Sequence, residues 1–505
     1  MAQGKVWLVG AGPGDIGLFT LKGLEVLQHA EVVVYDSLVG QGVLSMIPRE
    51  ARCIDVGKRA SHHTMPQEQI NQVLLEEAKK GLQVVRLKGG DPFLFGRGGE
   101  ELELLTEHGI PYEVVPGVTS PLAVPAYNGI PVTHRDFCSS LHIITGHKRA
   151  GSEYDIDFGA LVQTKGTLVF LMGVTALGDI CRGLIAAGMD GDMPAAVLQK
   201  GTTAGQKRIV ATVSTLEAEV ARQGIETPAI IVVGKVCSLA KRFEWYEKLP
   251  LSGWKVLLTR PRDLISGMAV KLRAKGAEVL ELPAIRTEPR EDQSALLLAL
   301  DRIGTYQWLV FTSPTGVRVF FEEMAKAGRD IRSLANVRIA AIGKGTEGKL
   351  RDRGLFVDLM PEIYDGDHLG ETLARECSPG VRVLIPRAGK GNAHLVELLE
   401  EAGAYVDDVP IYDTVYDSQE LIDESREFAA GSIDCAVFTS ASTVKGFVES
   451  TKGLDYRLVK AACIGRQTME AAKAFGMTAY MAEKATMDSL VELVIQMKGS
   501  EGTWN

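Results

Sequence analysis

Cysteine is scarce in this chain of 505 residues, and its spacing excludes two classes of small stabilised protein. The cysteines are odd in number and scattered, and none forms a C-x-x-C pair. They are Cys53, Cys138, Cys181, Cys237, Cys377, Cys435 and Cys463. A disulfide scaffold would use an even, closely spaced set, and a structural zinc site would use paired ligands. The sequence therefore predicts free thiols in a reducing cytoplasm and no bound metal.

Long hydrophobic runs and an excess of positive charge are also missing. No apolar run approaches the roughly 18–20 residues that span a bilayer, and Gly10 to Asp15 interrupt the first apolar stretch too early for a signal peptide. The net charge of −9 and the isoelectric point near 5.6 oppose general nucleic-acid binding, which needs a basic face. We expect neither a membrane nor a nucleic acid as partner.

The chain is rich in glycine, and its glycines separate alternating strand-like and helix-like segments. Short β-type runs, beginning with "KVWLVG" at Lys5–Gly10, alternate with helical patterns such as Gln67–Lys80. This alternation is typical of parallel βαβ units whose ligands bind at the glycine-rich strand ends. The length predicts two to four compact modules.

The second half of the chain repeats itself. "VFTSPTGVRVFF" at Val310–Phe321 matches "VFTSASTVKGFV" at Val437–Val448, and "AAIGKGT" at Ala340–Thr346 matches "ACIGRQT" at Ala462–Thr468. Two copies are too few for a solenoid, so we expect a bilobal unit with a ligand cleft between its lobes. Charge, aromatic residues and proline in 241–253 indicate a linker before it.

The stretch "VGAGPGD" opens a glycine loop that imitates a dinucleotide fingerprint through Gly12, Gly14 and Gly17. Asp15, however, stands where the following helix would receive a phosphate, and Pro13 removes a backbone donor. The loop is therefore expected to hold a cationic ligand. Two alternatives stay open, a plain tight turn and a dinucleotide site.

The second glycine loop, "RLKGGDPFLFGRGGEE" at Arg86–Glu101, follows another β-type run. Its Gly-Gly-Asp-Pro turn would let a ligand approach bare backbone. Neither loop has the lysine pattern of a nucleoside-triphosphate site.

Eight motifs in order resemble the uroporphyrinogen-III C-methyltransferases over roughly the first 240 residues. They are "VGAGPGD", "VVYDSLV", "VGKRA", "KGGDPFLFGRGGEE", "VVPGVTS", "PAYNGIPVTHR", "LVFLMG" and "LQKGTT". The resemblance implies the two-lobed tetrapyrrole-methylase fold, with lobes of about 1–136 and 137–240 in a domain of 1–240. It also implies S-adenosyl-L-methionine as cofactor, S-adenosyl-L-homocysteine as its product, and a homodimer formed through this half.

The same resemblance assigns site residues. Cofactor contacts fall on Pro13, Gly89, Gly90, Asp91, Leu94, Thr119, Ser120, Met172 and Gly201. Asp36 matches the family's proposed proton acceptor and Lys58 its proposed proton donor. The alternative is that Asp36 caps a loop and Lys58 neutralises substrate.

The family's substrate is an octacarboxylate, which requires local positive charge. Arg97, Tyr127 and Arg135 are its expected contacts. Further cations near the loops are Lys58, Arg59, Arg86, Lys88 and His134, and the alternative for each is a solvated surface charge. The neighbouring pair His62-His63 has poor geometry for a metal.

The repeated half resembles uroporphyrinogen-III synthase over about residues 253–494, through "LLTRP", "VFTSPTGV", "IGKGT", "VPIYDT", "FTSASTV" and "IGRQT". This implies a bilobal α/β fold with an internal repeat over 254–498. Its first lobe would comprise 254–288 and 415–498, and its second 289–414, joined by a two-stranded connection.

Tyr412 of "PIYDT" matches that family's candidate acid, and it breaks the repeat because its counterpart is Ile285. Expected substrate contacts are Ser313, Thr346, Ser440 and Thr468. The alternatives are packing of Tyr412 at a strand end and helix capping by the hydroxyl residues.

The two resemblances together predict a cytoplasmic bifunctional enzyme, a lyase and a methyltransferase. It would close hydroxymethylbilane to uroporphyrinogen III with inversion of the last ring, then methylate that product twice to precorrin-2, towards sirohaem or cobalamin. One alternative is a different corrin-pathway methylase fused to the synthase. The other is an active methyltransferase whose C-terminal half is a non-catalytic tetrapyrrole-binding module.

Overall fold

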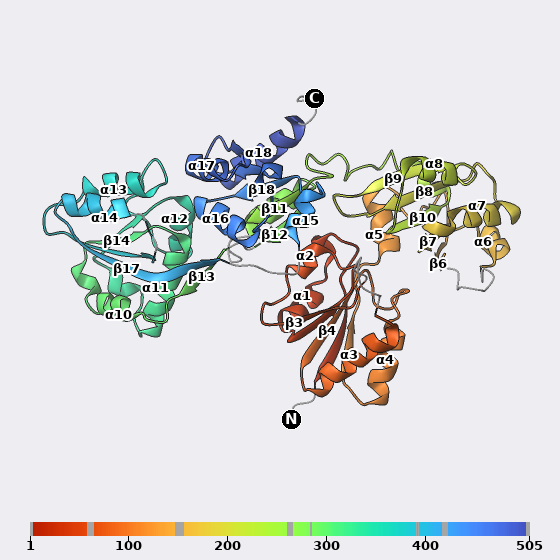
Figure 1. Cartoon of the computed structure of the whole chain (residues 1–505), viewed down its shortest axis with the longest axis horizontal. Coiled ribbons are helices and arrows are strands. Elements are labelled where there is room, and N and C mark those ends of the chain that lie inside the picture. The colour runs from red at the N-terminus through yellow and green to blue at the C-terminus, as the bar shows by residue number, and fades with distance from the viewer. Residues whose placement is uncertain are drawn as a thin grey trace.

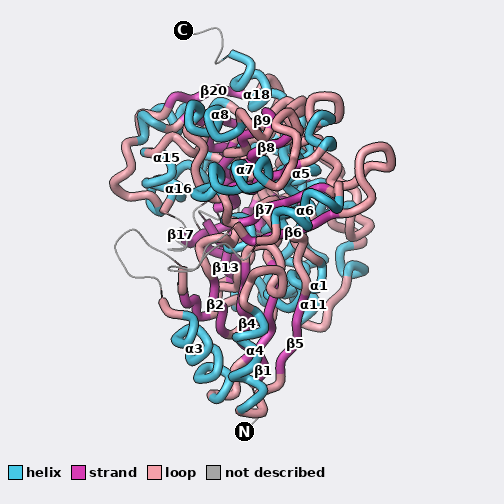
Figure 2. The backbone as a smooth tube through the Cα atoms, turned by 90° about the vertical axis from the view of Figure 1, so that its right-hand side faces the viewer, coloured by secondary structure: helices cyan, strands magenta, loops and turns pink. Residues whose placement is uncertain are grey.

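The computed structural model describes residues 4–57, 65–146, 156–259, 266–282, 285–389, 391, 393–416 and 423–500. Within these ranges the chain forms four five-stranded sheets, each covered by helices (Figure 1). Two sheets belong to the first half and two to the second. The strand β1 and the helix α18 lie at opposite ends of the molecule (Figure 2).

The first sheet has the strand order β3-β2-β4-β1-β5, and every described pairing in it is parallel. Its strands are β1 (Lys5–Gly10), β2 (Val32–Tyr35), β3 (Arg52–Asp55), β4 (Gln83–Lys88) and β5 (Tyr112–Val115). Its helices are η1 (Ile16–Leu18), α1 (Leu21–Gln28), α2 (Gln41–Leu44), α3 (Gln67–Lys79) and α4 (Gly98–Glu107). All residues of β2 are buried, as expected for a strand covered on both faces. The prediction of parallel βαβ units is confirmed for this lobe.

The second sheet has the order β6-β7-β10-β8-β9 and, unlike the first, is mixed. β6 pairs with β7 in parallel, but β10 runs antiparallel to β7 and β8, and β8 antiparallel to β9. For β8 and β9 the reason is local: a short loop without a helix joins them, which permits only a hairpin.

The strands of this second lobe are β6 (Leu141–Thr145), β7 (Thr167–Leu171), β8 (Pro194–Gln199), β9 (Lys207–Thr212) and β10 (Ala229–Val233). Its helices are α5 (Ser120–Tyr127), which leads into it, α6 (Phe158–Thr164), η2 (Val174–Ala176), α7 (Leu177–Ala186), α8 (Leu216–Gln223) and η3 (Lys235–Leu239).

The third sheet combines the start and the end of the second half in the order β12-β11-β18-β19-β20, all parallel. Its strands are β11 (Lys255–Thr259), β12 (Glu278–Leu282), β18 (Cys435–Phe438), β19 (Lys460–Cys463) and β20 (Thr478–Met481). Its helices are α9 (Ser266–Ala274), α15 (Glu424–Ala429), α16 (Ala441–Ser450), η7 (Tyr456–Leu458), α17 (Arg466–Ala474) and α18 (Met487–Ser500). We call this unit lobe one.

The fourth sheet, lobe two, has the order β13-β17-β16-β14-β15. Its strands are β13 (Ile285–Pro289), β14 (Trp308–Phe311), β15 (Arg338–Ala341), β16 (Arg382–Ala388) and β17 (Tyr405–Tyr416). Its helices are α10 (Ser294–Asp301), η5 (Ile303–Thr305), α11 (Pro314–Lys326), η6 (Ile331–Leu334), α12 (Lys344–Arg351), α13 (Gly366–Ala374) and α14 (Ala393–Glu401). β13 and β17 pair antiparallel and form the long ribbon that leads towards lobe one in Figure 1.

The strand orders confirm the internal repeat. β12-β11-β18-β19 of lobe one and β17-β16-β14-β15 of lobe two place the matching sequence segments at the same sheet positions. Lobe one is assembled from two distant pieces of chain, because the whole of lobe two is inserted between β12 and β18.

The segment 241–253, predicted as a linker, packs against its neighbours. Tyr246 and Leu251 are buried, and Trp245 donates a hydrogen bond to the carbonyl of Ala126 at 2.9 Å. The two halves are thus connected by an ordered segment. Among the described helices, none is both long and apolar enough to cross a membrane.

Candidate functional site

Three loops converge at the carboxyl ends of β1, β4 and β5, and glycine is required where they touch. A Cβ atom on Gly10 would lie 2.5 Å from the Cα atom of Gly117 and 2.6 Å from the carbonyl oxygen of Gly90. Gly12 and Gly90 exchange backbone hydrogen bonds of 3.2 and 2.7 Å. The two glycine loops of the sequence therefore form one surface of bare backbone at the sheet edge where α/β proteins bind ligands.

The Gly89-Gly90 turn has two different reasons for its glycines. A Cβ atom on Gly89 would lie 2.5 Å from the Cβ atom of Leu38, so the close approach of the Asp36–Gly40 loop demands glycine. Gly90 has φ +69°, and a Cβ atom there would meet nothing within 4 Å. The backbone conformation demands the second glycine, and the space beside it is open to a ligand.

Asp15 stands at the N-terminus of η1, as predicted, and each of its two carboxylate oxygens accepts a hydrogen bond. It accepts a hydrogen bond from the amide of Gly17 and another from the hydroxyl of Tyr127, both at 2.7 Å. The amide of Asp15 donates to Oγ1 of Thr202 at 3.2 Å. A carboxylate therefore occupies the helix end that a phosphate would need, and it joins the first lobe to the second.

Asp91 shapes its loop from within. One carboxylate oxygen accepts hydrogen bonds from the amides of Phe93 and Leu94 at 2.8 and 3.1 Å, and the other accepts from the amide of Gly117 at 3.1 Å. Since three amides use the carboxylate, Asp91 fixes the backbone that a cofactor would touch. Its direct contact with a cofactor stays a prediction.

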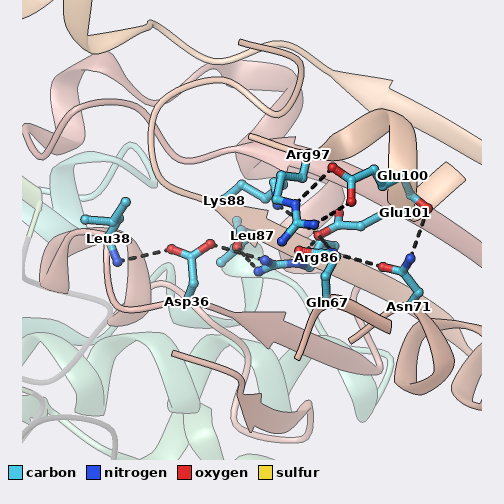
Figure 3. Close-up of polar contacts among 10 residues, drawn as sticks. All are labelled: Asp36, Leu38, Gln67, Asn71, Arg86, Leu87, Lys88, Arg97, Glu100 and Glu101. Carbon is cyan, nitrogen blue, oxygen red and sulfur yellow. Dashed lines mark hydrogen bonds and ion pairs between the residues drawn. The ribbon is translucent and has the colours of Figure 1, made fainter. Parts of the chain in front are cut away.

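A buried charged cluster lies behind Asp36 (Figure 3). The guanidinium of Arg86 donates to Oδ2 of Asp36 and to Oε1 of Glu101, each at 3.2 Å. Glu101 Oε1 also accepts hydrogen bonds from Lys88 Nζ at 2.9 Å and from Gln67 Nε2 at 3.2 Å. Glu101 is 0% exposed and Arg86 2%. Two cations and two carboxylates balance, which is the condition for keeping such charges away from water.

The alternative that Arg86 and Lys88 are solvated surface charges is wrong, and their contact with substrate stays a prediction. Both side chains extend from β4, the central strand of a sheet that is covered on both faces. Burial and the charge of Arg86 lower the pKa of Lys88, and the carboxylate of Glu101 opposes this effect. These cations hold Asp36 and Glu101 in place.

Asp36 has the loop-capping role that the sequence left open, and its role as proton acceptor stays a prediction. Its Oδ1 accepts a hydrogen bond from the amide of Leu38 at 3.1 Å, so it does cap its loop. Its Oδ2 faces Arg86, and the side chain is 23% exposed. The predicted partner Lys58 lies outside the described residues, as do Arg59 and the pair His62-His63.

Two of the predicted substrate contacts present positive charge to solvent. Arg97 has a left-handed backbone with φ +58°, and its exposed guanidinium is held by Glu100 at 2.9 and 2.7 Å. Arg135 is also exposed. The hydroxyl of Tyr127, in contrast, is bonded to Asp15, and burial together with that carboxylate raises the pKa of Tyr127. Tyr127 therefore contributes to the junction between lobes.

The other predicted cofactor contacts also lie where strands end. Met172 follows β7 with φ +55° and is 52% exposed. Gly201 follows β8, and a Cβ atom there would lie 2.3 Å from Cγ1 of Val124. Thr119 occupies the N-cap position of α5, without a side-chain capping hydrogen bond, and Ser120 begins the helix. The half-exposed Pro13 and Leu94 belong to the two glycine loops.

Backbone strain is concentrated in the same loops. In the described part of the chain, the non-glycine residues with positive φ at these strand ends are Phe95, Arg97, Met172, Lys200 and Thr202. Lys165, which ends α6, is the one further case there. Such conformations persist where surrounding structure enforces them, and they gather at binding sites.

Sequence reasoning missed Glu101 and Thr202. Glu101 centres the buried cluster, and its signal was a second acidic residue directly after the glycines of "GRGGEE". Thr202 belongs to the quoted motif "LQKGTT", but its contact with Asp15 joins residues far apart in the chain.

In lobe two, Tyr412 is 5% exposed and belongs to the core around Phe311 and Ile411. Its hydroxyl lies 2.8 Å from Oγ of Ser313. Burial raises the pKa of Tyr412, while the hydrogen bond with Ser313 opposes this effect. Packing at a strand is therefore observed, and the phenol keeps one hydroxyl partner through which a proton could pass.

The serines and threonines of the repeat occupy equivalent places in the two lobes. Ser313 caps α11 by accepting from the amide of Gly316 at 2.9 Å, and Ser440 caps α16 by accepting from Thr443 at 3.2 Å. Thr346 and Thr468 are 2% and 4% exposed in the first turns of α12 and α17. The capping alternative is observed for both serines, and substrate contact by the two threonines stays a prediction.

Two family models match the chain, one on each half. The model described as Tetrapyrrole (Corrin/Porphyrin) Methylases matches residues 5–217, which contain the glycine loops and the buried charged cluster. The model described as Uroporphyrinogen-III synthase HemD matches residues 266–492, which contain most of the repeated lobes.

Curated relatives match along the chain as well. A protein of Ruminiclostridium josui named Porphyrin biosynthesis protein HemD is 47% identical over 99% of both chains. A Uroporphyrinogen-III C-methyltransferase of Bacillus subtilis is 41% identical over 71% of this chain and 73% of its own. A Siroheme synthase of Salmonella typhimurium is 52% identical over 48% of this chain and 52% of its own. The chain therefore belongs to the family of enzymes that fuse a tetrapyrrole methylase to a uroporphyrinogen-III synthase.

Proposed function

We propose that the two halves catalyse consecutive steps. The synthase half would close hydroxymethylbilane to uroporphyrinogen III with inversion of the last ring. The methylase half would then methylate this product twice to precorrin-2, towards sirohaem or cobalamin. The observation that carries the proposal is the presence of both families in one chain. The synthase family is named for making uroporphyrinogen III, and a relative of the methylase half is named for methylating that same compound. The relative named Siroheme synthase favours the sirohaem branch.

The surface of bare backbone formed by the two glycine loops fits S-adenosyl-L-methionine, with S-adenosyl-L-homocysteine as product, better than it fits a nucleotide. Asp15 already supplies negative charge at the helix end, where a phosphate would be repelled. Gly90 offers open space beside bare backbone. When bound, the cofactor would supply an electrophilic methyl group on a positively charged sulfur. The other contacts proposed on the same edge are Pro13, Gly89, Asp91, Leu94, Thr119, Ser120, Met172 and Gly201.

The chain's own residues would position the acceptor and remove a proton. Arg97 and Arg135 are exposed cations suited to the carboxylates of a tetrapyrrole. Asp36 is oriented by Leu38 and Arg86 and is partly exposed, so it could accept the proton lost from the methylated carbon. Alignment of the two reactants would supply much of the rate.

In the synthase half, Tyr412 is the proposed acid. Its phenol would protonate the departing hydroxyl of the bilane, and Ser313, 2.8 Å away, would hold the phenol in orientation. Loss of water leaves a delocalised cation on the bilane, so the two lobes mainly need to hold the linear bilane in a conformation that can close. Ser440 and the backbone at Thr346 and Thr468 would bind its carboxylates.

One experiment tests the proposal against its main alternative, a C-terminal half that only binds tetrapyrrole. The purified chain is supplied with hydroxymethylbilane and methyl-labelled S-adenosyl-L-methionine, and the products are separated by isomer. We expect the type-III macrocycle with two labelled methyl groups. Type-I macrocycle alone, formed by spontaneous closure, would refute the synthase activity. A product methylated elsewhere would favour a different corrin-pathway methylase.

We further propose a homodimer through the methylase half and a cytoplasmic location. All seven cysteines are free thiols, as a reducing compartment requires. Sedimentation of the whole chain and of residues 1–240 would test the dimer and the half that forms it.

A further inference from the structure

The methylase half and lobe one meet at a polar cluster built around Lys255. Lys255 Nζ lies 3.2 Å from Glu278 and 3.4 Å from Glu427, both also in lobe one. Gln41 of α2 reaches this cluster from the methylase half: its Oε1 accepts from Lys255 and its Nε2 donates to Glu427, each at 3.2 Å. We call these four residues the Lys255 cluster. In Figure 1, α2 lies beside β12, which begins at Glu278.

A second contact starts from the same cluster. The free oxygen of Glu278, Oε2, accepts a hydrogen bond from the amide of Ala204 at 2.8 Å. Ala204 belongs to the β8–β9 loop, which also carries Gly201 and Thr202. Lobe one therefore contacts the methylase half at two separate segments, through Glu427 at Gln41 and through Glu278 at Ala204. Lys255 is paired with both of these carboxylates.

Each of these two segments forms a wall of the Gly12–Gly17 loop. At the first, a Cβ atom on Gly40 would lie 2.9 Å from the carbonyl oxygen of Gly14, so the start of α2 packs directly on the loop. At the second, a Cβ atom on Gly14 would lie 2.7 Å from Cγ2 of Thr203. Thr202 also accepts from the amide of Asp15. The cluster thus holds both walls of the loop that the proposed function assigns to the cofactor.

The cluster lies away from the proposed synthase residues. Lys255 and Glu278 are the first residues of the parallel strands β11 and β12, whereas Ser440 and Thr468 follow the carboxyl ends of β18 and β19. Because all strands of this sheet run parallel, the first pair lies at the amino ends of the strands and the second pair at their carboxyl ends. A role of the cluster in ring closure is therefore not suggested by its position.

The cluster is only partly exposed, so its charges interact strongly. The exposed fractions of the side chains are 13% for Lys255, 26% for Glu278 and 24% for Glu427. Burial alone would lower the pKa of Lys255, but the two carboxylates outweigh it and raise that pKa. The lysine stays charged at neutral pH and neutralises one of the two carboxylates, while Gln41 adds no charge.

We propose that the synthase half positions the cofactor loop of the methylase half through Gln41, Lys255, Glu278 and Glu427. These are positioning residues, since each acts through the α2 wall or the β8–β9 wall and none lies on the cofactor surface itself. The inference rests on the proposed function, because it concerns affinity for S-adenosyl-L-methionine. It assigns to the fusion a physical coupling that a separate methylase would lack.

The test exchanges an amide and a carboxylate across the junction in the whole chain. Gln41→Glu places a second carboxylate against Glu427, and we expect its repulsion to weaken binding of S-adenosyl-L-methionine about fivefold or more, a usual size for coupling between sites. Combining Gln41→Glu with Glu427→Gln restores one carboxylate and one amide beside Lys255, and binding should recover. Calorimetric titration of both variants measures the affinity.

The matched control is Glu281→Gln. Glu281 lies on β12, as Glu278 does, but its carboxylate is paired with Arg273 of α9 and not with the methylase half. This variant should leave the affinity unchanged. Hydrogen exchange in residues 40–46 and 201–206 should rise in Gln41→Glu and return to normal in the double variant. The rate of ring closure, measured on the same preparations, should not change.

Unchanged affinity in Gln41→Glu would overturn the inference, and so would a double variant as weak as the single one. If the unaltered chain binds S-adenosyl-L-methionine and methylates its acceptor, either result removes the coupling alone and leaves the proposed function standing. If the unaltered chain binds no S-adenosyl-L-methionine, the proposed function fails, and the inference fails with it.

Discussion

The guanidinium of Arg86 connects the partly exposed carboxylate of Asp36, 3.2 Å away, to the interior of the methylase half. Its other carboxylate partner, Glu101, is completely buried and also accepts a hydrogen bond from Lys88. The orientation of Asp36 therefore depends on charges that are buried within the methylase half. Two of the predictions below separate the chemical role of Asp36 from the structural role of the cluster behind it.

Replacing Glu101 by Gln should destabilise the methylase half strongly. The variant would leave Arg86 and Lys88 buried with one carboxylate between them, and breaking a buried ion pair costs about 3–5 kcal/mol. Urea unfolding would measure the loss. The control is the neighbouring Glu100→Gln, which removes an exposed ion pair with Arg97 and should cost less than about 1 kcal/mol. Equal losses in the two variants would contradict the structural role of Glu101.

Replacing Asp36 by Asn should lower kcat for methylation by about 10²–10⁴ if its carboxylate accepts a proton, since this is the usual contribution of a general base. The amide oxygen can still accept from Leu38, so the loop cap is retained. Steady-state kinetics at saturating cofactor would measure kcat and KM separately. A raised KM with unchanged kcat would show that Asp36 only positions substrate. Asp190→Asn, which alters a surface turn cap, is the control.

Replacing Tyr412 by Phe should slow ring closure and leave methylation unchanged. The variant keeps the packing of the ring but loses the hydroxyl that lies 2.8 Å from Ser313, at a stability cost of about 1 kcal/mol. Synthase rate with hydroxymethylbilane is the measurement. Tyr405→Phe removes a hydroxyl from an exposed tyrosine on the same strand and serves as control. An unchanged synthase rate in Tyr412→Phe would refute the proposed acid.

Glu424 should make the stability of lobe one depend on pH. Burial, together with the nearby charges of Asp423 and Glu427, raises the pKa of Glu424 from its usual 4.5 to about 7. Between these values the folded chain binds a proton that the unfolded chain releases, so the free energy of unfolding should fall as pH rises through this window. The fall would reach about 3 kcal/mol above pH 7.

Urea unfolding at pH 5 and pH 8 would test this dependence. Glu424→Gln should remove it and be the more stable protein at pH 8. Glu449→Gln, which changes an exposed carboxylate on α16, should behave like the unaltered chain. A dependence that persists in Glu424→Gln would assign the effect to another group.

Local sequence determined much of the fold. Hydrophobic runs and glycine positions predicted β1, β4, α3 and the α/β class, because buried strands and strand-end turns are specified by neighbouring residues. The repeat predicted two related lobes, and the strand orders bear this out. The placement of Asp15 at a helix N-terminus also followed from its own loop.

Only the tertiary structure decided which charges face water. Arg86 and Lys88 look like available cations in the sequence, and their burial depends on β4 becoming the central strand and on Glu101 arriving from α4. The contact of Gln41 with Lys255 and Glu427 likewise joins residues that lie far apart in the chain. Sequence patterns report the preferences of short segments, whereas the environment of a charged side chain is set by whatever distant segments pack around it.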